Sequence, residues 1–156
     1  MGLQFGPKIV TNGLILALDA SDVNSYPGSG TIWYDLSGNL INGTLTNGPT
    51  FSSANSGSIV FDGVDDYIAE SNFSSTITTS FTLAFWVNFT NAGSPSAQKI
   101  FHAQNGTPEV NLDNYNGGSG NPKLHFYTNA SGGSSDAVLT SNEDIVNNTW
   151  YYVVGV

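Results

Sequence analysis

The stretch that decides the fold is residues 81–89, which read Phe-Thr-Leu-Ala-Phe-Trp-Val-Asn-Phe. Large apolar side chains occupy every second position from Phe81 to Phe89, and Thr, Ala, Trp and Asn stand between them. A period of two places the two sets on opposite faces of a β-strand, whereas a helix would spread the aromatic rings around its circumference. The pattern therefore predicts a long strand, and one of its two faces must lie in the core.

Short segments of the same kind recur along the whole chain, and clusters of Gly, Asn, Ser and Pro separate them. The predicted strands are 14–19, 43–46, 58–62, 66–70, 81–89, 99–103, 109–112, 123–128, 137–140 and 150–156. One short helical turn is expected around residues 142–146. Many short strands with regular turns and almost no helical period predict an all-β, antiparallel sandwich or barrel.

Charge is scarce and strongly one-sided. Three lysines and no arginine stand against 12 acidic residues, for a formal net charge of -9. Nucleic acids and anionic membrane surfaces are both bound through Lys and Arg, so the composition argues against both as partners. No apolar run approaches the ~20 residues that a membrane span needs. Neutral surfaces such as sugars, cations such as calcium, and other proteins are the partners that fit.

The length of the chain and its lack of Cys indicate what type of protein it is. The 156 residues are the size of one domain and can bury a core without disulfides. With no Cys in the chain, thiolate nucleophiles and cysteine metal sites are excluded. The start, from Met1 to Lys8, lacks the basic and apolar segments of a signal peptide. Such a chain suits a virion component made in the cytoplasm and released by lysis, or a protein exported by another route.

Six segments carry motifs whose order along the chain is informative. They lie at residues 13–20, 26–39, 42–45, 57–68, 81–87 and 148–154, and residues 61–67 read Phe-Asp-Gly-Val-Asp-Asp-Tyr. Together they resemble the laminin-G-like domain of the concanavalin A-like lectin/glucanase jelly rolls. The first half most resembles versions found in structural proteins of tailed bacteriophages, notably aquatic ones. The resemblance implies one antiparallel β-sandwich (jelly roll) domain over residues 1–156, with residues 1–12 as an N-terminal arm.

The chain departs from this family pattern after the strand at Trp150. In the family a further hairpin and more strands follow, whereas the sequence ends at Val156. The sandwich is therefore expected to be incomplete at the C-terminus, as a fragment, as a reduced variant, or as a fold that neighbouring subunits complete. An unfinished sheet leaves an edge that can pair with another chain.

Catalytic patterns are missing from the sequence. Glycosidases need two carboxylates ~5 to 10 Å apart, and enzymes of the resembled fold usually carry them on one strand as Glu-x-Asp-x-x-Glu. Here Glu70, Glu109 and Glu143 are isolated. His102 and His125 each stand beside a Phe in a predicted strand, which is more typical of a sheet histidine than of a catalytic base. We therefore predict that the protein is not an enzyme.

Two oxygen-rich segments are candidate calcium sites. Asp62, Asp65 and Asp66 surround a Gly turn, and residues 105–109 with Asp113 form the second group. Calcium prefers carboxylate and carbonyl oxygens on loops. The same aspartates can instead cap the turn through bonds to backbone N–H groups, and we favour that interpretation. The sequence assigns no metal ligands, and calcium is the one candidate cofactor.

Sugar recognition combines aromatic faces with amide and carboxylate groups around them. The predicted ligand-binding residues are Trp86, Asn105, Tyr115 and Tyr127. Trp86 stands opposite the Phe-rich face of its strand, and Tyr115 lies among Asn and Gly residues. Trp33 and Trp150 are expected to pack in the core or within hairpins.

The function expected from these features is that of a non-enzymatic virion structural protein. It would be a decoration, fibre or tail-associated jelly roll that binds copies of itself or other virion proteins and contacts host glycans. The alternative is a carbohydrate-binding or adhesion module of a secreted bacterial protein, located outside the cell or on its surface. Both hypotheses predict no hydrolysis of oligosaccharides.

Overall fold

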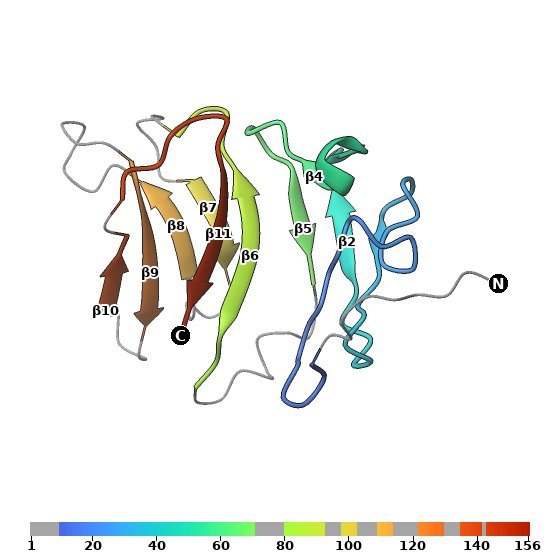
Figure 1. Cartoon of the computed structure of the whole chain (residues 1–156), viewed down its shortest axis with the longest axis horizontal. Helices are drawn as coiled ribbons and strands as arrows, with labels where there is room; N and C mark the ends of the chain where they lie inside the picture. Colours follow the sequence, from blue (N-terminus) through green and yellow to red (C-terminus); the bar gives the residue numbers. More distant parts are fainter. Residues whose placement is uncertain are drawn as a thin grey trace. The chain divides into compact units, whose positions relative to one another are not determined.

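The computed structural model describes residues 10–70, 80–92, 98–102, 109–113, 122–129, 135–141 and 143–156. These residues form antiparallel strands and a single turn of 3-10 helix, so the predicted all-β, antiparallel fold is confirmed (Figure 1). The chain divides into two compact units, residues 1–76 and residues 77–156. A single domain over residues 1–156 stays a prediction. Residues 1–9 of the expected N-terminal arm lie outside the described part.

The first unit, residues 1–76, contains two small antiparallel sheets. The three-stranded sheet has the order β1-β2-β5, with β1 at Ile32–Trp33, β2 at Gly43–Thr46 and β5 at Tyr67–Ala69. The two-stranded sheet pairs β3, Thr50–Ser52, with β4, Ser58–Val60, and the 3-10 turn η1, Ala54–Ser56, connects them. Strands β1 and β3 were not predicted, because two or three residues are too few to show an alternating pattern.

The strand predicted at residues 14–19 is wrong, because other groups take the place of a partner strand. The Asp35 carboxylate accepts a hydrogen bond from the Ala17 N–H at 2.9 Å, and the Leu36 N–H donates to the Ala17 carbonyl at 2.8 Å. The Asn39 amide donates to the carbonyls of Leu14 and Ile15 at 3.0 and 2.9 Å. The backbone polar groups are thus satisfied without a sheet ladder.

The second unit, residues 77–156, contains the longest strands. Strand β6, Leu83–Asn88, pairs with β11, Trp150–Gly155, along all six residues of each. The other sheet has the order β10-β9-β8-β7, with β7 at Gln98–His102, β8 at Glu109–Asp113, β9 at Lys123–Asn129 and β10 at Ser135–Thr140. These six strands coincide with six predicted ones, and no end is shifted by more than two residues.

The core of the second unit lies between these two sheets. Phe89, Ala92, Leu124 and Ile145 are buried together, and Val87, Ile100, Tyr151 and Val153 pack against them. Strands β6 and β11 thus contribute one face to the core and β7 and β9 contribute the other side, as in a β-sandwich. The Phe-rich face of residues 81–89 is the inner one, and the face that carries Trp86 is the outer one.

Gly155 is a point where the two layers approach closely. A Cβ atom at this position would lie 2.2 Å from the ring of Phe126 in β9, so no other residue fits without moving that ring. Phe126 is itself buried and stacks on Phe81, with ring centroids 6.1 Å apart. The glycine near the end of β11 therefore lets a large aromatic ring fill the space between the sheets.

The helical turn expected at residues 142–146 is not formed by its described residues, 143–146. The Ile145 N–H donates to the carbonyl of Pro122 at 2.8 Å, which draws the segment against the start of β9. Burial of the Ile145 side chain in the core accompanies this bond. Tertiary packing here outweighs a weak local helix signal. In the described part of the chain, no helix is long and apolar enough to cross a membrane.

Candidate functional site

The outer face of the β6–β11 sheet carries three exposed aromatic side chains of the described part of the second unit. We call it the aromatic face, and it consists of Ala84, Trp86 and Asn88 of β6 and Trp150, Tyr152 and Val154 of β11. The register places these residues in three opposite pairs, Trp150 with Asn88, Tyr152 with Trp86, and Val154 with Ala84. The residues between them point into the core, so the period of two places all six side chains on the outer face of the sheet.

Trp86 and Tyr152 form the centre of this face. Their ring centroids lie 5.1 Å apart and the rings are tilted by 39° to each other. Trp86 remains 65% exposed and Tyr152 remains 58% exposed, so their mutual contact covers only part of each ring. Large aromatic side chains normally bury most of their surface. Two of them left exposed side by side mark a surface that is available to a ligand.

The segment before β11 fixes the position of the aromatic face. The Asn148 N–H donates to the Phe89 carbonyl at 2.7 Å, and the Asn147 side chain accepts from the Ala92 N–H at 2.7 Å. The Val146 N–H donates to the Tyr151 hydroxyl at 2.8 Å. These bonds tie the start of β11 to the end of β6, so Trp150 enters the sheet opposite Asn88.

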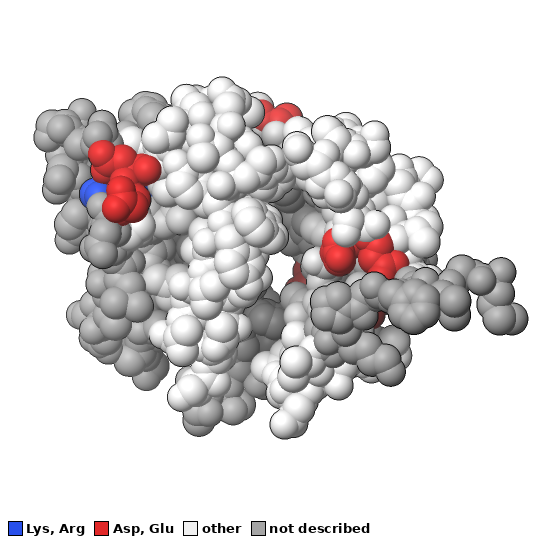
Figure 2. All heavy atoms as spheres, in the orientation of Figure 1, with Lys and Arg blue, Asp and Glu red and all other residues white. Residues whose placement is uncertain are grey.

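The aromatic face carries no charged residue. Figure 2 shows an uncoloured surface over β6 and β11, with acidic groups confined to other parts of this view. In the second unit, the acidic side chain of Asp144 lies 3.1 Å from the Lys123 ammonium and both are partly exposed. The face can therefore contact a neutral ligand without removing water from an ion.

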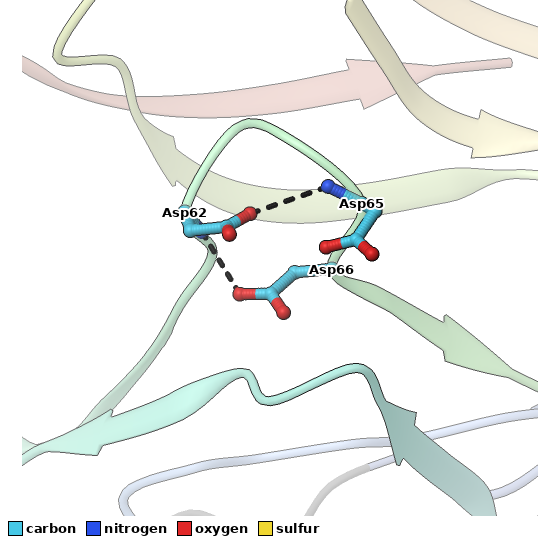
Figure 3. Close-up of side chains that lie close together, drawn as sticks. All are labelled: Asp62, Asp65 and Asp66. Atoms are coloured by element: carbon cyan, nitrogen blue, oxygen red, sulfur yellow. Dashed lines mark hydrogen bonds between the residues drawn. The ribbon is translucent and has the colours of Figure 1, made fainter.

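A cluster of three carboxylates lies in the loop between β4 and β5 of the first unit. Oxygen atoms of Asp62, Asp65 and Asp66 lie within 4.8 Å of one another (Figure 3). One Asp62 oxygen accepts from the Val64 N–H at 2.8 Å and from the Asp65 N–H at 3.4 Å. An Asp66 oxygen accepts from the Asp62 N–H at 2.9 Å. The loop is thus closed by its own carboxylates.

Electrostatics in this loop follow from the same bonds. The pKa of Asp62 lies below its ordinary value because the Val64 N–H stabilises the ionised carboxylate more than desolvation destabilises it, and the Asp65 N–H adds a smaller effect in the same direction as Val64. These are the bonds expected of an aspartate that caps a turn. The oxygens left over are of the kind that calcium binds, and calcium binding here stays a prediction. In the second calcium candidate, residues 105–108 lie outside the described part.

Comparison with known families decides the relationship of the chain. Residues 62–156 match a laminin-G family model described as the concanavalin A-like lectin/glucanases superfamily, and this span is more than half of the chain. The chain belongs to the concanavalin A-like lectin/glucanase superfamily. The match includes the acidic loop and the whole of the second unit. No curated protein and no solved structure gives a match to the chain.

The superfamily includes both lectins and glucanases, and glucanases are distinguished by their catalytic carboxylates. Among the described side chains, the acidic cluster of Asp62, Asp65 and Asp66 is the one group of three that lies close together, and it belongs to a loop. Asp144 is paired with the Lys123 ammonium, and Glu143 is exposed. These carboxylates do not form the alternating row on one strand that a glucanase of this fold would use.

The two histidines have different surroundings. His125 lies in β9 opposite Asn111 of β8 and is 1% exposed, whereas His102 lies at the end of β7 and is exposed. A side chain buried this deeply within a sheet is closed to a substrate. This placement agrees with the interpretation of His125 as a structural residue of the sheet.

Of the predicted ligand-binding residues of this superfamily member, Trp86 lies on the aromatic face. Tyr127 belongs to β9, where only its backbone is described. Asn105 and Tyr115 lie outside the described residues. The structure thus places one of the four at a candidate site.

Sequence reasoning missed Tyr152 and Trp150. Trp150 was expected in the core or within a hairpin, and it is 38% exposed on the outer face that it shares with Tyr152. A signal was present, because the strand predicted over residues 150–156 places Trp150, Tyr152 and Val154 on one face. It is ambiguous when read alone, since Tyr151 and Val153 are as apolar as the residues between them. Trp33, the other tryptophan expected in a core or hairpin, packs edge-on against Tyr26 with centroids 6.5 Å apart.

Proposed function

We propose that this chain is a non-enzymatic virion structural protein that contacts host glycans through its aromatic face. The observation that carries the proposal is the exposed Trp86–Tyr152 pair on an uncharged sheet face. Sugar rings present apolar C–H faces to aromatic side chains, while hydroxyl and amide groups at the edge supply orientation. Membership of a superfamily that contains lectins supports this ligand class.

The non-enzymatic part of the proposal has its own support. Hydrolysis of a glycosidic bond needs an acid and a base or nucleophile on the two sides of that bond. The aromatic face has no carboxylate. The carboxylates of the Asp62 loop already accept hydrogen bonds from the backbone, which suits a structural role. A sugar bound on the aromatic face would therefore be held and released unchanged.

The setting that we propose is the particle of a tailed bacteriophage, where many copies would assemble with each other or with other virion proteins. The support is the resemblance of the first half to structural proteins of such particles. A carbohydrate-binding or adhesion module at a bacterial cell surface is the alternative. Immunogold labelling of purified particles separates the two settings, because a virion protein is labelled at regular positions on the particle. Particles without label, together with label on bacterial cells, would support the adhesion module.

A glycan array tests the ligand class. The wild-type chain should bind a subset of neutral glycans, and Trp86→Ala combined with Tyr152→Ala should abolish the signal. The matched control is Tyr67→Ala, because Tyr67 in β5 is 50% exposed but belongs to the other unit. That control should bind as the wild type does. An array on which the wild type binds no glycan would refute the proposed function.

Incubation with the same glycans tests for turnover. No shorter product should appear by mass spectrometry after prolonged incubation. Hydrolysis that disappears when Asp62 or Asp66 is changed to Asn would show that the protein is an enzyme.

A further inference from the structure

We infer that the aromatic face is built for a single, extended chain of neutral pyranose units. It would bind this polymer better than a charged glycan, a short oligosaccharide or the flat surface of a crystalline polysaccharide. The inference rests on the proposed function and adds the class of glycan to it. Four properties of the face carry it, namely its charge, the tilt of its rings, its length and its area.

Charge selects a neutral ligand. The six residues of the aromatic face are all uncharged, and the whole chain carries a net charge of -9. An anionic glycan would approach against this field and would find no Lys or Arg on the face to pair with. A neutral sugar is not repelled by the net charge and needs no cationic partner. Uronic acids, sulfated sugars and sialic acids should therefore bind worst.

The tilt of the two central rings argues against a flat ligand. Trp86 and Tyr152 are inclined by 39°, so one plane cannot lie against both ring faces. A crystalline polysaccharide presents a plane, whereas successive units of a single chain can turn relative to each other. The pair therefore fits a chain in solution better than a crystal surface.

The length of the face favours a polymer over a short sugar. Trp150 lies two residues before Tyr152 on β11, which places the two side chains about 7 Å apart along the strand. Trp86 adds a third ring across from Tyr152. Three rings spread in two directions exceed the size of one sugar unit. A ligand must therefore extend over several units to contact all of them.

The area of the face argues against a second copy of the chain as its occupant. Trp86, Trp150, Tyr152 and Val154 are 65%, 38%, 58% and 51% exposed, which leaves on the order of 450 Å² of accessible surface on these four side chains. A stable protein–protein interface buries about 800 Å² on each partner. Patches of a few hundred Å² are common as ligand-binding surfaces of monomers.

Few polar groups on the face can orient a ligand. They are the amide of Asn88, the hydroxyl of Tyr152 and the indole N–H groups of Trp86 and Trp150. Binding would depend mainly on stacking, so one site should bind weakly and tolerate different linkages between sugar units. Many copies acting on one polymer would raise the apparent affinity by avidity. Weak binding at each site combined with avidity is expected of a surface protein that is present in many copies.

Affinity electrophoresis in native gels tests the inference, because the acidic chain migrates well and a soluble polymer in the gel retards only proteins that bind it. The polymers are a soluble β-glucan and a mannan as neutral chains and alginate as the charged chain. Cellobiose is added as a soluble competitor, and pull-down on microcrystalline cellulose measures crystal binding. The wild type should be retarded by at least one neutral chain and not by alginate. Cellobiose should compete at least about tenfold less well than the polymer, per sugar unit.

The variants assign the effect to the aromatic face. Trp86→Ala should weaken binding at least about tenfold, which corresponds to 1.4 kcal/mol. Tyr152→Phe, which keeps the ring, should change it less than about threefold, and the control Tyr67→Ala should leave it unchanged. Equal competition by cellobiose, stronger binding to alginate or to crystalline cellulose, or full binding by Trp86→Ala would overturn the inference while leaving glycan binding itself intact. No retardation and no pull-down of the wild type would instead defeat the proposed function. Loss of a dimer in Trp86→Ala, seen by sedimentation, would reassign the face to self-association.

Discussion

In the first unit, side chains supply backbone hydrogen bonds of the kind that neighbouring strands supply in the second unit. Residues 14–19 run beside the Asp35–Asn39 segment and are held by side-chain bonds from Asp35, Ser37 and Asn39. In the second unit β6 and β11 satisfy each other along their whole length, and their inner side chains fill a core. The difference teaches that polar sequence can specify a fold by local bonds, whereas a paired sheet leaves its outer face available for a ligand.

Asp35 connects three separate stretches of the first unit. It is 9% exposed, and its carboxylate accepts from the N–H groups of Ala17, Ser37 and Ile41 and from the Ser37 hydroxyl, at 2.6 to 3.1 Å. Ser25, which is fully buried, adds a similar bridge by donating to the Tyr34 carbonyl and accepting from the Asp19 N–H.

The largest expected effect is the loss of the Asp35 carboxylate. Asp35→Ala should lower the free energy of unfolding by about 3 kcal/mol, because it leaves several buried N–H groups without their acceptor. Urea denaturation followed by circular dichroism measures it. The control is Asp19→Ala, since Asp19 is exposed and bonds mainly within its own turn; its effect should stay under about 1 kcal/mol. Equal effects of the two variants would contradict the role of the Asp35 carboxylate in holding the first unit together.

The second prediction concerns the close approach of the two layers in the second unit. Gly155→Ala should lower the free energy of unfolding by about 2 kcal/mol, because the new methyl group collides with the Phe126 ring. Its neighbour Val154 is 51% exposed on the outer face, so Val154→Ala should cost less than about 1 kcal/mol. Thermal unfolding of both variants checks the difference. A tolerated Gly155→Ala would mean that β11 does not lie against β9.

A smaller effect is expected from pH. Burial raises the pKa of Asp35, but the bonds from Ser37, Ala17 and Ile41 together hold it below the ordinary value of 3.8. A carboxylate with a lowered pKa contributes stability above the pKa of the unfolded chain, and this contribution disappears as pH falls through the folded value. Stability should therefore be constant near neutrality and decline below about pH 4. In Asp35→Asn the decline should be shallower, and an unchanged slope would argue against an ionised Asp35.

The smallest effect on stability is expected on the aromatic face. Trp86→Ala combined with Tyr152→Ala should lower the free energy of unfolding by less than about 1 kcal/mol, because both residues are more than half exposed and their rings contact each other on the outside of the sheet. Chemical denaturation of this variant and of the wild type gives the value. A loss as large as that of Asp35→Ala would indicate that the rings support the fold, and would weaken their assignment to ligand binding.

Much of the second unit could be predicted from the sequence, because period-two patterns report sheet pairing directly. Residues 81–89 indicated both the strand and its two faces, and the outer position of Trp86 followed once one face was known. Tyr152 escaped prediction because residues 150–154 are apolar on both faces. A partner strand, not the local pattern, decides which of those faces is outside.

The first unit was less predictable. The residues 14–19 have the composition of a strand, yet their hydrogen-bond partners are the side chains of Asp35 and Asn39 about 20 residues away. Such long-range hydrogen bonds produce no periodic pattern in the sequence. The Asp62 loop was recognised as a turn because its Gly and Asp residues act locally, through bonds that span two to four residues.

The central claim is that a glycan binds the outer face of β6–β11, and the three tryptophans of the chain allow a direct test. Each gives one indole N–H signal in a two-dimensional NMR spectrum, and single substitutions assign them. Titration with a soluble neutral polysaccharide that binds should shift the signals of Trp86 and Trp150. The signal of Trp33, which packs against Tyr26 in the first unit, should stay in place. A shift of Trp33 with Trp86 and Trp150 unmoved would contradict the claim.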